Sequence, residues 1–274
     1  MDDILQDLST QSLIFAIENN IISLMEFFHK WPRVEVHDAA TLKWFISNIP
    51  FPLFNSILFA QLAPDQVDAT IEALIDKARQ RGVPLLWWIT PSTLPLDLVS
   101  HLERYGFKGE QPMPGMGVDL AILDEHPSMP PGFVVQKVAD ETDFKIYIQV
   151  FLEGFEMPEF VGDAFFELFG HIDSPSVHSY LGWLNGKPVA TSMLLLAAGV
   201  AGIFNVATIP EARRKGIGAL MTARPLLETR AMGYRVGTLG ASEMGFSVYR
   251  SLGFQEYCKI GQYVWLPEQD SSGE

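Results

Sequence analysis

The chain has 274 residues, a formal net charge of −14 and 48% hydrophobic residues, a composition that suits two folded domains or one enlarged domain. The acidic balance argues against general nucleic-acid binding, because phosphate backbones attract basic surfaces. The single cysteine, Cys258, excludes an internal disulfide and suits a reducing cytoplasm. The six histidines do not cluster with Cys258 at ligand spacing, so no metal site is indicated.

In chain order, the first clear elements lie between residues 67 and 123. The periodicity predicts a helix over 67–81, a strand over 85–90, a helix over 94–105 and a strand over 117–123. The first helix stops at Gly82 and the second at Gly106-Phe107. Residues 127–131 contain three prolines and predict a linker.

The C-terminal half predicts the order strand, helix, helix, three strands, helix, strand, helix, strand. Its first elements are a strand over 133–138, helices over 143–155 and 158–169, and strands over 177–183 and 187–196 joined at Asn185-Gly186. Residues 188–207 are long and apolar enough to span a membrane. A break at Gly199 and the polar Asn205 favour two adjacent buried strands instead.

The most informative segment is Arg213-Arg214-Lys215-Gly216-Ile217-Gly218, which follows a strand over 203–208 and precedes a helix. Cations at a helix N-terminus have the wrong sign for the helix dipole. Each glycine in a helix costs about 1 kcal/mol relative to alanine. Both features make sense if the turn binds an anion, because glycine lets backbone N–H groups approach it and cations neutralise it.

The spacing differs from two other phosphate-binding loops. The nucleotide-triphosphate loop needs four residues between its glycines, then Lys and Ser or Thr. The dinucleotide fingerprint needs three glycines and a later acidic residue. Instead, Arg213-x-x-Gly216-x-Gly218 after a strand resembles the signature of the GCN5-related N-acetyltransferase (GNAT) family.

This resemblance implies an α/β fold with a mixed sheet, the acyl-CoA N-acyltransferase fold, and acetyl-coenzyme A as co-substrate. In the family the basic glycine loop binds the coenzyme pyrophosphate, and the preceding strand holds the pantetheine. The coenzyme-binding residues that it implies here are Val206, Ala207, Thr208, Arg213, Arg214, Lys215, Gly216, Ile217, Gly218, Ala219 and Ser242. Ser242 is a departure, because many relatives have asparagine there. Pro225, inside the helix after the loop, is another.

A second motif lies downstream. After a strand over 234–241 and a helix over 243–252, the run Tyr249-Arg250-Ser251-Leu252-Gly253-Phe254 resembles the family's Tyr-x-x-x-Gly-Phe element. There the tyrosine commonly protonates the departing coenzyme thiolate, which makes Tyr249 the candidate catalytic acid. The alternative is that Tyr249 only packs in the core.

The resemblance implies direct attack by an acceptor amine on the thioester in a ternary complex. Residues 201–205 lack the glutamate that many relatives carry on this strand. The base that takes the amine proton is left open among Glu153, Glu156, Glu243 and water. The negative charge is compatible with a cationic acceptor, a small molecule or peptide. The competing interpretation is a non-catalytic acetyl-CoA sensor.

The N-terminal half repeats the order helix, strand, helix, Gly-Phe, strand. Aligning Gly82 with Gly233 places Leu62, Asp65 and Val67 opposite Arg213, Gly216 and Gly218, and aligning Gly106 with Gly253 places Leu102 opposite Tyr249. The sequence thus resembles a tandem GNAT protein with a degenerate N-terminal copy. The expected division is 1–126, a linker over 127–131, and a catalytic domain over 132–268. A cytoplasmic location without membrane or nucleic-acid partners is expected, and the oligomeric state is open.

Overall fold

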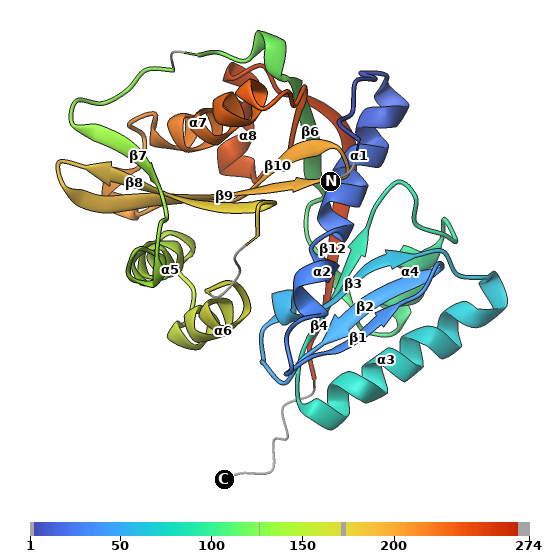
Figure 1. The fold of residues 1–274 in the computed structure, drawn as a ribbon. Helices are drawn as coiled ribbons and strands as arrows, with labels where there is room; N and C mark the ends of the chain where they lie inside the picture. The colour runs from blue at the N-terminus through green and yellow to red at the C-terminus, as the bar shows by residue number, and fades with distance from the viewer. Residues whose placement is uncertain (1–2, 126, 171–173, 268–274) are drawn as a thin grey trace. The chain divides into compact units, whose positions relative to one another are not determined.

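The structure is a computed structural model that describes residues 3–125, 127–170 and 174–267 (Figure 1). The chain forms two compact units. The first comprises Met1–Ser23 and Pro114–Cys258, and the second comprises Leu24–Met113 and Lys259–Glu274. Each unit is described on its own below.

The first unit contains a mixed sheet with helices on both faces. Its helices are α1 (Thr10–Ile22), α5 (Glu141–Phe155), α6 (Glu159–Phe169), α7 (Ile217–Ala231) and α8 (Glu243–Ser251), with 3-10 turns η3 (Leu120–Ile122) and η4 (Pro210–Ala212). Its strands are β6 (Met113–Asp119), β7 (Phe133–Lys137), β8 (Val177–Leu184), β9 (Lys187–Ala197), β10 (Val200–Thr208) and β11 (Val236–Gly240), with the start of β12 (Gln255–Trp265).

The sheet of this unit has the order β6-β11-β10-β9-β8-β7. The β10–β11 pair is parallel and the other pairs are antiparallel. Figure 1 shows α7 on one face and α5 and α6 on the other. Leu194, Ile203, Met221 and Leu226 belong to the core beneath α7. Most of β9 and the first four residues of the adjacent β10 are buried, which explains the long apolar run.

The second unit is smaller. Its helices are α2 (Met25–Phe28), α3 (Val67–Arg81) and α4 (Leu98–Arg104), with 3-10 turns η1 (Pro52–Phe54) and η2 (Pro64–Gln66). Its strands are β1 (Glu35–Asp38), β2 (Leu42–Ile46), β3 (Asn55–Ala60), β4 (Leu85–Ile89), β5 (Lys108–Gly109) and the end of β12. The strand order is β1-β2-β3-β4-β12, with β5 also paired to β12. Trp87, Leu98 and Leu102 lie in its core.

The predicted order of elements over 132–268 is confirmed. The hairpin at Asn185-Gly186 has positive φ angles of 50° and 78°, and α3 ends at Gly82 in the left-handed region, both as predicted. Helix α7 continues through Pro225 to Ala231. Two elements of the N-terminal half have other bounds than predicted. Helix α4 begins at Leu98 and not at 94, and the strand predicted over 117–123 begins at Met113, ends at Asp119 and passes into η3.

The compact units do not follow the linear division at residues 127–131. Strand β6 pairs with β11, from Gly115↔Gly240 to Asp119↔Val236, and so joins the first unit. The end of β12 pairs with β4, from Gly261↔Ile89 to Trp265↔Leu85, and joins the second unit. Residues 127–131 contain no helix or strand among those described and lie within the first unit.

None of the helices in the described ranges is long and apolar enough to cross a membrane. In the same ranges, no group of three or more His, Cys, Asp or Glu side chains could hold a metal ion.

Candidate functional site

The basic glycine segment forms the connection between β10 and α7. The 3-10 turn η4 ends at Ala212, and α7 begins at Ile217. Within the connection, Arg214 and Gly216 have positive φ angles of 60° and 77°. The positive φ angle favours glycine at position 216, because other residues adopt this conformation only at a cost in free energy. A Cβ atom there would also lie 3.0 Å from the Ser128 carbonyl oxygen.

The N-terminus of α7 has no side-chain cap from its N-cap residue, Gly216. Ser9, Asp140 and Ser242 cap α1, α5 and α8, whereas the N-cap residues of α2, α3, α4 and α6 form no such bond either. The first backbone N–H groups of a helix have no partner within the helix and lie at the positive end of its dipole. A Cβ atom at Gly218 would meet nothing within 4 Å. The protein's own packing therefore does not require glycine at this position.

The three cations of the loop differ in their surroundings. Arg213 is about 30% exposed, and its Nε and Nη2 donate to the carbonyls of Thr208 and Gly154, both at 3.0 Å. Lys215 is exposed, and its Nζ donates to the Glu211 carbonyl at 3.2 Å. Arg214 is exposed, which leaves its guanidinium able to meet a ligand. Ile217 is buried in the core, so only its backbone is available.

Strand β10 departs from regular pairing just before the loop. Its parallel pairing with β11 covers only Ala201 to Ile203. Its register with β9 shifts between Phe204 and Ala207, where Asn205 has a φ of 52°. This bulge is a local feature that the sequence analysis missed, although asparagine tolerates the left-handed conformation better than most residues. Val206, Ala207 and Thr208 thus lie on a stretch of β10 beyond its contact with β11.

A buried tyrosine lies beneath the bulge. Tyr147 of α5 is 1% exposed, and its hydroxyl has no hydrogen-bond partner in the described residues. Burial raises the pKa of this hydroxyl, although the nearby Asn205 and Ser179 oppose the increase. Asn205 Nδ2 has a weak contact with Met193 Sδ at 3.8 Å. The polar groups under the bulge therefore retain hydrogen-bonding capacity.

Tyr249 lies in α8, and Ser242 is the N-cap residue just before that helix. Tyr249 is 7% exposed, packs on Phe254 and belongs to the same core cluster as Ile217 at the start of α7. Burial raises the pKa of its hydroxyl to about 12, so it is protonated at neutral pH. Ser242 caps α8, its Oγ accepting from the Gly245 N–H at 3.2 Å. The hydroxyl proton of Ser242 is still available to donate.

The candidate bases lie on two helices, Glu153 and Glu156 at the end of α5 and Glu243 at the start of α8. Glu153, Glu156 and Glu243 are all exposed. Glu156 ends α5 in the left-handed conformation, and its Oε1 lies 3.7 Å from Arg213 Nη2. Glu243 lies in the first turn of α8. The structure thus places Glu156 beside the loop residue Arg213.

The second unit repeats this arrangement without the loop. Just after α4, the Phe107 N–H donates to the Leu102 carbonyl at 3.0 Å, as the Phe254 N–H of the first unit does to the Tyr249 carbonyl at 3.1 Å. Leu102, with no exposed surface, therefore occupies the position of Tyr249. Turn η2 ends at Gln66 and α3 begins at Val67. The residues that separate η4 from α7, 213–216, have no counterpart, which corrects the alignment of Leu62 and Asp65 with Arg213 and Gly216.

In the second unit, the segment at Leu94 pairs with the end of β3. The parallel pairing of β3 and β4 is short and covers only Ser56 and Ile57, just as the pairing of β10 and β11 is short in the first unit. Leu94 continues the pairing of β3: its N–H donates to the Ala60 carbonyl, and its carbonyl accepts from the Leu62 N–H, both at 3.0 Å. Gln61 forms a parallel bridge with Leu94. These bonds explain why α4 begins late, at Leu98.

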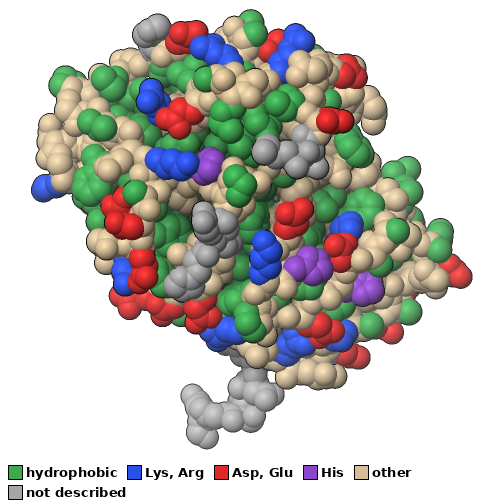
Figure 2. All heavy atoms as spheres, viewed as in Figure 1, with side chains coloured by type: hydrophobic (Ala, Val, Ile, Leu, Met, Phe, Trp, Pro, Cys, Tyr) green, Lys and Arg blue, Asp and Glu red, His purple; other side chains and the backbone are tan. Residues whose placement is uncertain are grey.

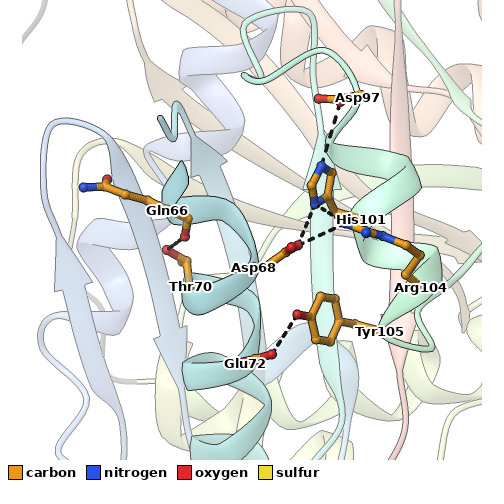
Figure 3. A network of polar contacts seen from close by, with 8 residues as sticks. All are labelled: Gln66, Asp68, Thr70, Glu72, Asp97, His101, Arg104 and Tyr105. Carbon is orange, nitrogen blue, oxygen red and sulfur yellow. Dashed lines mark hydrogen bonds and ion pairs between the residues drawn. The ribbon is translucent and has the colours of Figure 1, made fainter. Parts of the chain in front are cut away.

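The first turn of α3 carries its own anion (Figure 3). Asp68 Oδ1 lies 2.6 Å from His101 Nδ1 and 3.2 Å from Arg104 Nη2. The hydrogen bond from His101, with the charge of Arg104, lowers the pKa of Asp68. Next to this pair, the Tyr105 hydroxyl donates to Glu72 at 2.7 Å. The Arg104 guanidinium and the His101 ring near this helix start are thus in contact with a carboxylate of the same unit.

Comparisons with known proteins agree on the fold. No protein-family model matches the sequence, and no curated protein matches it. Among solved structures, a GCN5-related N-acetyltransferase from Kribbella flavida is similar with a TM-score of 0.70 and 17% identity over 98% of this chain and 99% of that one. One from Sphaerobacter thermophilus has a TM-score of 0.64 and 15% identity over 91% and 88%.

A tandem GNAT protein from the clavulanic acid biosynthesis pathway has a TM-score of 0.59 and 12% identity, over 98% of this chain and 99% of that one. The chain therefore has the acyl-CoA N-acyltransferase fold, in the two-copy form that the sequence predicted. At these identities the likeness establishes the fold and not the activity.

Proposed function

We propose that this protein transfers an acetyl group from acetyl-coenzyme A to an amine. The observation that carries the proposal is the uncapped start of α7, with exposed cations before it and open space at Gly218. This arrangement suits an anion whose oxygens come close to the first backbone N–H groups of α7. The N-acetyltransferase names of structures with the same fold add support.

In this proposal the coenzyme-binding residues are those implied by the sequence except Arg213, whose side chain donates to the Thr208 and Gly154 carbonyls. Backbone groups of residues 216–219 and the cations of Arg214 and Lys215 bind the pyrophosphate. Val206, Ala207 and Thr208 offer backbone groups to the pantetheine and thioester, beyond the point where β10 leaves β11. Ser242 Oγ donates a hydrogen bond from the start of α8. The second unit, which lacks the loop, takes no coenzyme.

The proposed reaction is a direct transfer. The amine nitrogen of the acceptor attacks the thioester carbonyl carbon, the carbon–sulfur bond breaks, and the sulfur takes the proton of the Tyr249 hydroxyl. The amine loses one proton to Glu153, Glu156, Glu243 or water, and a proton returns to Tyr249 from solvent. A backbone N–H near Val206 would stabilise the negative charge that develops on the carbonyl oxygen.

Calorimetry with coenzyme A and acetyl-coenzyme A tests the binding half of the proposal. We expect one site per chain, because only the first unit has the loop. A thiol-release assay with acetyl-coenzyme A and a panel of primary amines tests the transfer. Binding without thiol release for any amine class would favour the sensor interpretation. Absence of binding would contradict both interpretations.

A further inference from the structure

The Arg213 side chain is directed to the protein's own backbone. Its Nε donates to the Thr208 carbonyl at the end of β10, and its Nη2 donates to the Gly154 carbonyl at the end of α5, both at 3.0 Å. Its Nη2 also lies 3.7 Å from Glu156 Oε1. One guanidinium thus joins α5, β10 and the loop.

The contact with Gly154 caps α5. A helix leaves its last carbonyls without partners, and a cation there interacts favourably with the helix dipole. At the end of α5, the N–H groups of Glu156 and Met157 bond to the carbonyls of Glu153 and Leu152. The Gly154 carbonyl receives its bond from Arg213, a residue 59 positions away in the sequence. The end of α5 therefore depends on the loop.

The same end of α5 packs directly on β10. A Cβ atom at Gly154 would lie 2.7 Å from Ala207 Cβ and 3.4 Å from the Thr208 backbone nitrogen. Ala207 and Thr208 belong to the stretch of β10 that we assign to the coenzyme. Movement of the loop or of this stretch of β10 would therefore displace the backbone at Gly154.

We propose that Arg213 is a positioning residue that fixes the α5–α6 turn, residues 156–158, to the coenzyme loop, so that coenzyme binding orders the turn. The inference rests on the proposed function. The Arg213 side chain then acts through the Gly154 and Thr208 carbonyls. The positive charge near the coenzyme comes from Arg214 and Lys215. The turn carries Glu156 and follows Glu153, and Figure 2 shows acidic side chains gathered over α5 and α6. Arg213 would thus set where these carboxylates stand relative to the thioester.

Amide hydrogen exchange of the full chain tests the inference without an acceptor. In coenzyme-free protein, Arg213→Met should speed exchange of the Glu156 and Met157 amides about tenfold, since the bond to a charged donor is lost. Adding coenzyme A should protect these amides in the wild-type protein. In Arg213→Met that protection should be absent although coenzyme A still binds.

Arg214→Met is the matched control, because Arg214 is exposed in the same loop. It should weaken coenzyme A binding and leave exchange of the turn unchanged in the free protein. Arg213→Lys keeps the charge but cannot make both carbonyl bonds, so an intermediate exchange rate is expected. This variant replaces Arg213→Met if the latter does not fold.

Two results would overturn the inference. The first is a wild-type rate of amide exchange in the turn of the coenzyme-free Arg213→Met variant. The second is an equal loss of coenzyme A affinity in Arg213→Met and Arg214→Met, with the turn of Arg213→Met still protected when coenzyme A binds. The second result would make Arg213 a phosphate ligand. Failure of the wild-type protein to bind coenzyme A would instead refute the proposed function. The comparison of the coenzyme-free proteins would then still decide whether Arg213 holds the turn.

Discussion

At the scale of single residues, the two loop glycines are needed for different reasons. Gly216 is needed by the backbone, with a φ of 77° and a crowded Cβ position. Gly218 has free space around its Cβ position and no positive φ. A motif search treats them alike, but the structure predicts that only one of them can be replaced without strain.

We expect Gly218→Val to abolish coenzyme A binding while the fold is retained, because the side chain enters space that the pyrophosphate would occupy. Calorimetry measures the affinity, and thermal unfolding checks the fold. Gly216→Val is the comparison, and it should lower the melting temperature because its left-handed conformation is strained for valine. Unchanged affinity in Gly218→Val would show that the loop is not the coenzyme site.

Tyr249→Phe should lower turnover by about 10- to 1,000-fold and change coenzyme affinity little, because a positioned acid acts as the sulfur departs. The comparison of turnover number with calorimetric affinity checks this split. Phenylalanine keeps the packing on Phe254, so stability should be preserved. Wild-type turnover in this variant would reduce Tyr249 to a core residue, with water as the proton source.

The raised pKa of Tyr249 also has a consequence for stability. Its folded-state pKa of about 12 lies above the ordinary value of 10.0. Below pH 10 both states keep the proton, and the unfolded state loses it first as the pH rises. Stability should therefore fall between about pH 10 and 12. Denaturant titrations at several pH values should show a smaller loss in Tyr249→Phe than in the wild-type protein.

At the scale of elements, α1 joins the first unit through a close contact. Asn20 Nδ2 donates to the carbonyls of Leu195 and Ala197 at 3.3 and 3.1 Å. Its Oδ1 lies 1.8 Å from where a Gly202 Cβ would be. The helix can approach β10 this closely only because residue 202 has no side chain.

Gly202→Ala should therefore destabilise the protein by about 1–3 kcal/mol, the usual cost of overpacking a core. Chemical denaturation measures the loss. Gly218→Ala adds a methyl group in open space and should leave stability nearly unchanged. The double variant Asn20→Ala/Gly202→Ala should recover part of the loss, since Asn20 is the nearest obstacle and Phe204 the next. Additive losses in the double variant would mean that α1 does not limit this position.

Local signals in the sequence predicted most of the elements correctly. Gly82 and Asn185-Gly186 require special backbone conformations, and amphipathic periodicity is itself local. The late start of α4 could not be predicted, because it depends on bonds of Leu94 to Ala60 and Leu62. The partners of Arg213 could not be predicted either, since Gly154 is distant in sequence. Assignment of Tyr249 and the loop to coenzyme chemistry stays a prediction.

At the scale of the whole molecule, the linear halves and the compact units differ. Strand β6 and helix α1 come from the first half of the sequence but pack in the first unit with residues from the second half. Leu13 and Ala16 of α1 form a cluster with Val200 and Val236, while Met116 and Val118 of β6 lie in the main core. A catalytic domain defined by residues 132–268 alone would lack these elements.

A fragment that starts at Ser128 should therefore fail to fold cooperatively, because its β11 would have an unpaired edge and buried surface would be exposed. Thermal melts followed by circular dichroism would show the absence of a sharp transition. Co-expression with residues 1–126 should restore a cooperative transition and coenzyme A binding, since that fragment supplies both α1 and β6. A fragment that unfolds cooperatively and binds coenzyme A without this partner would mean that residues 128–274 fold by themselves and do not need α1 and β6.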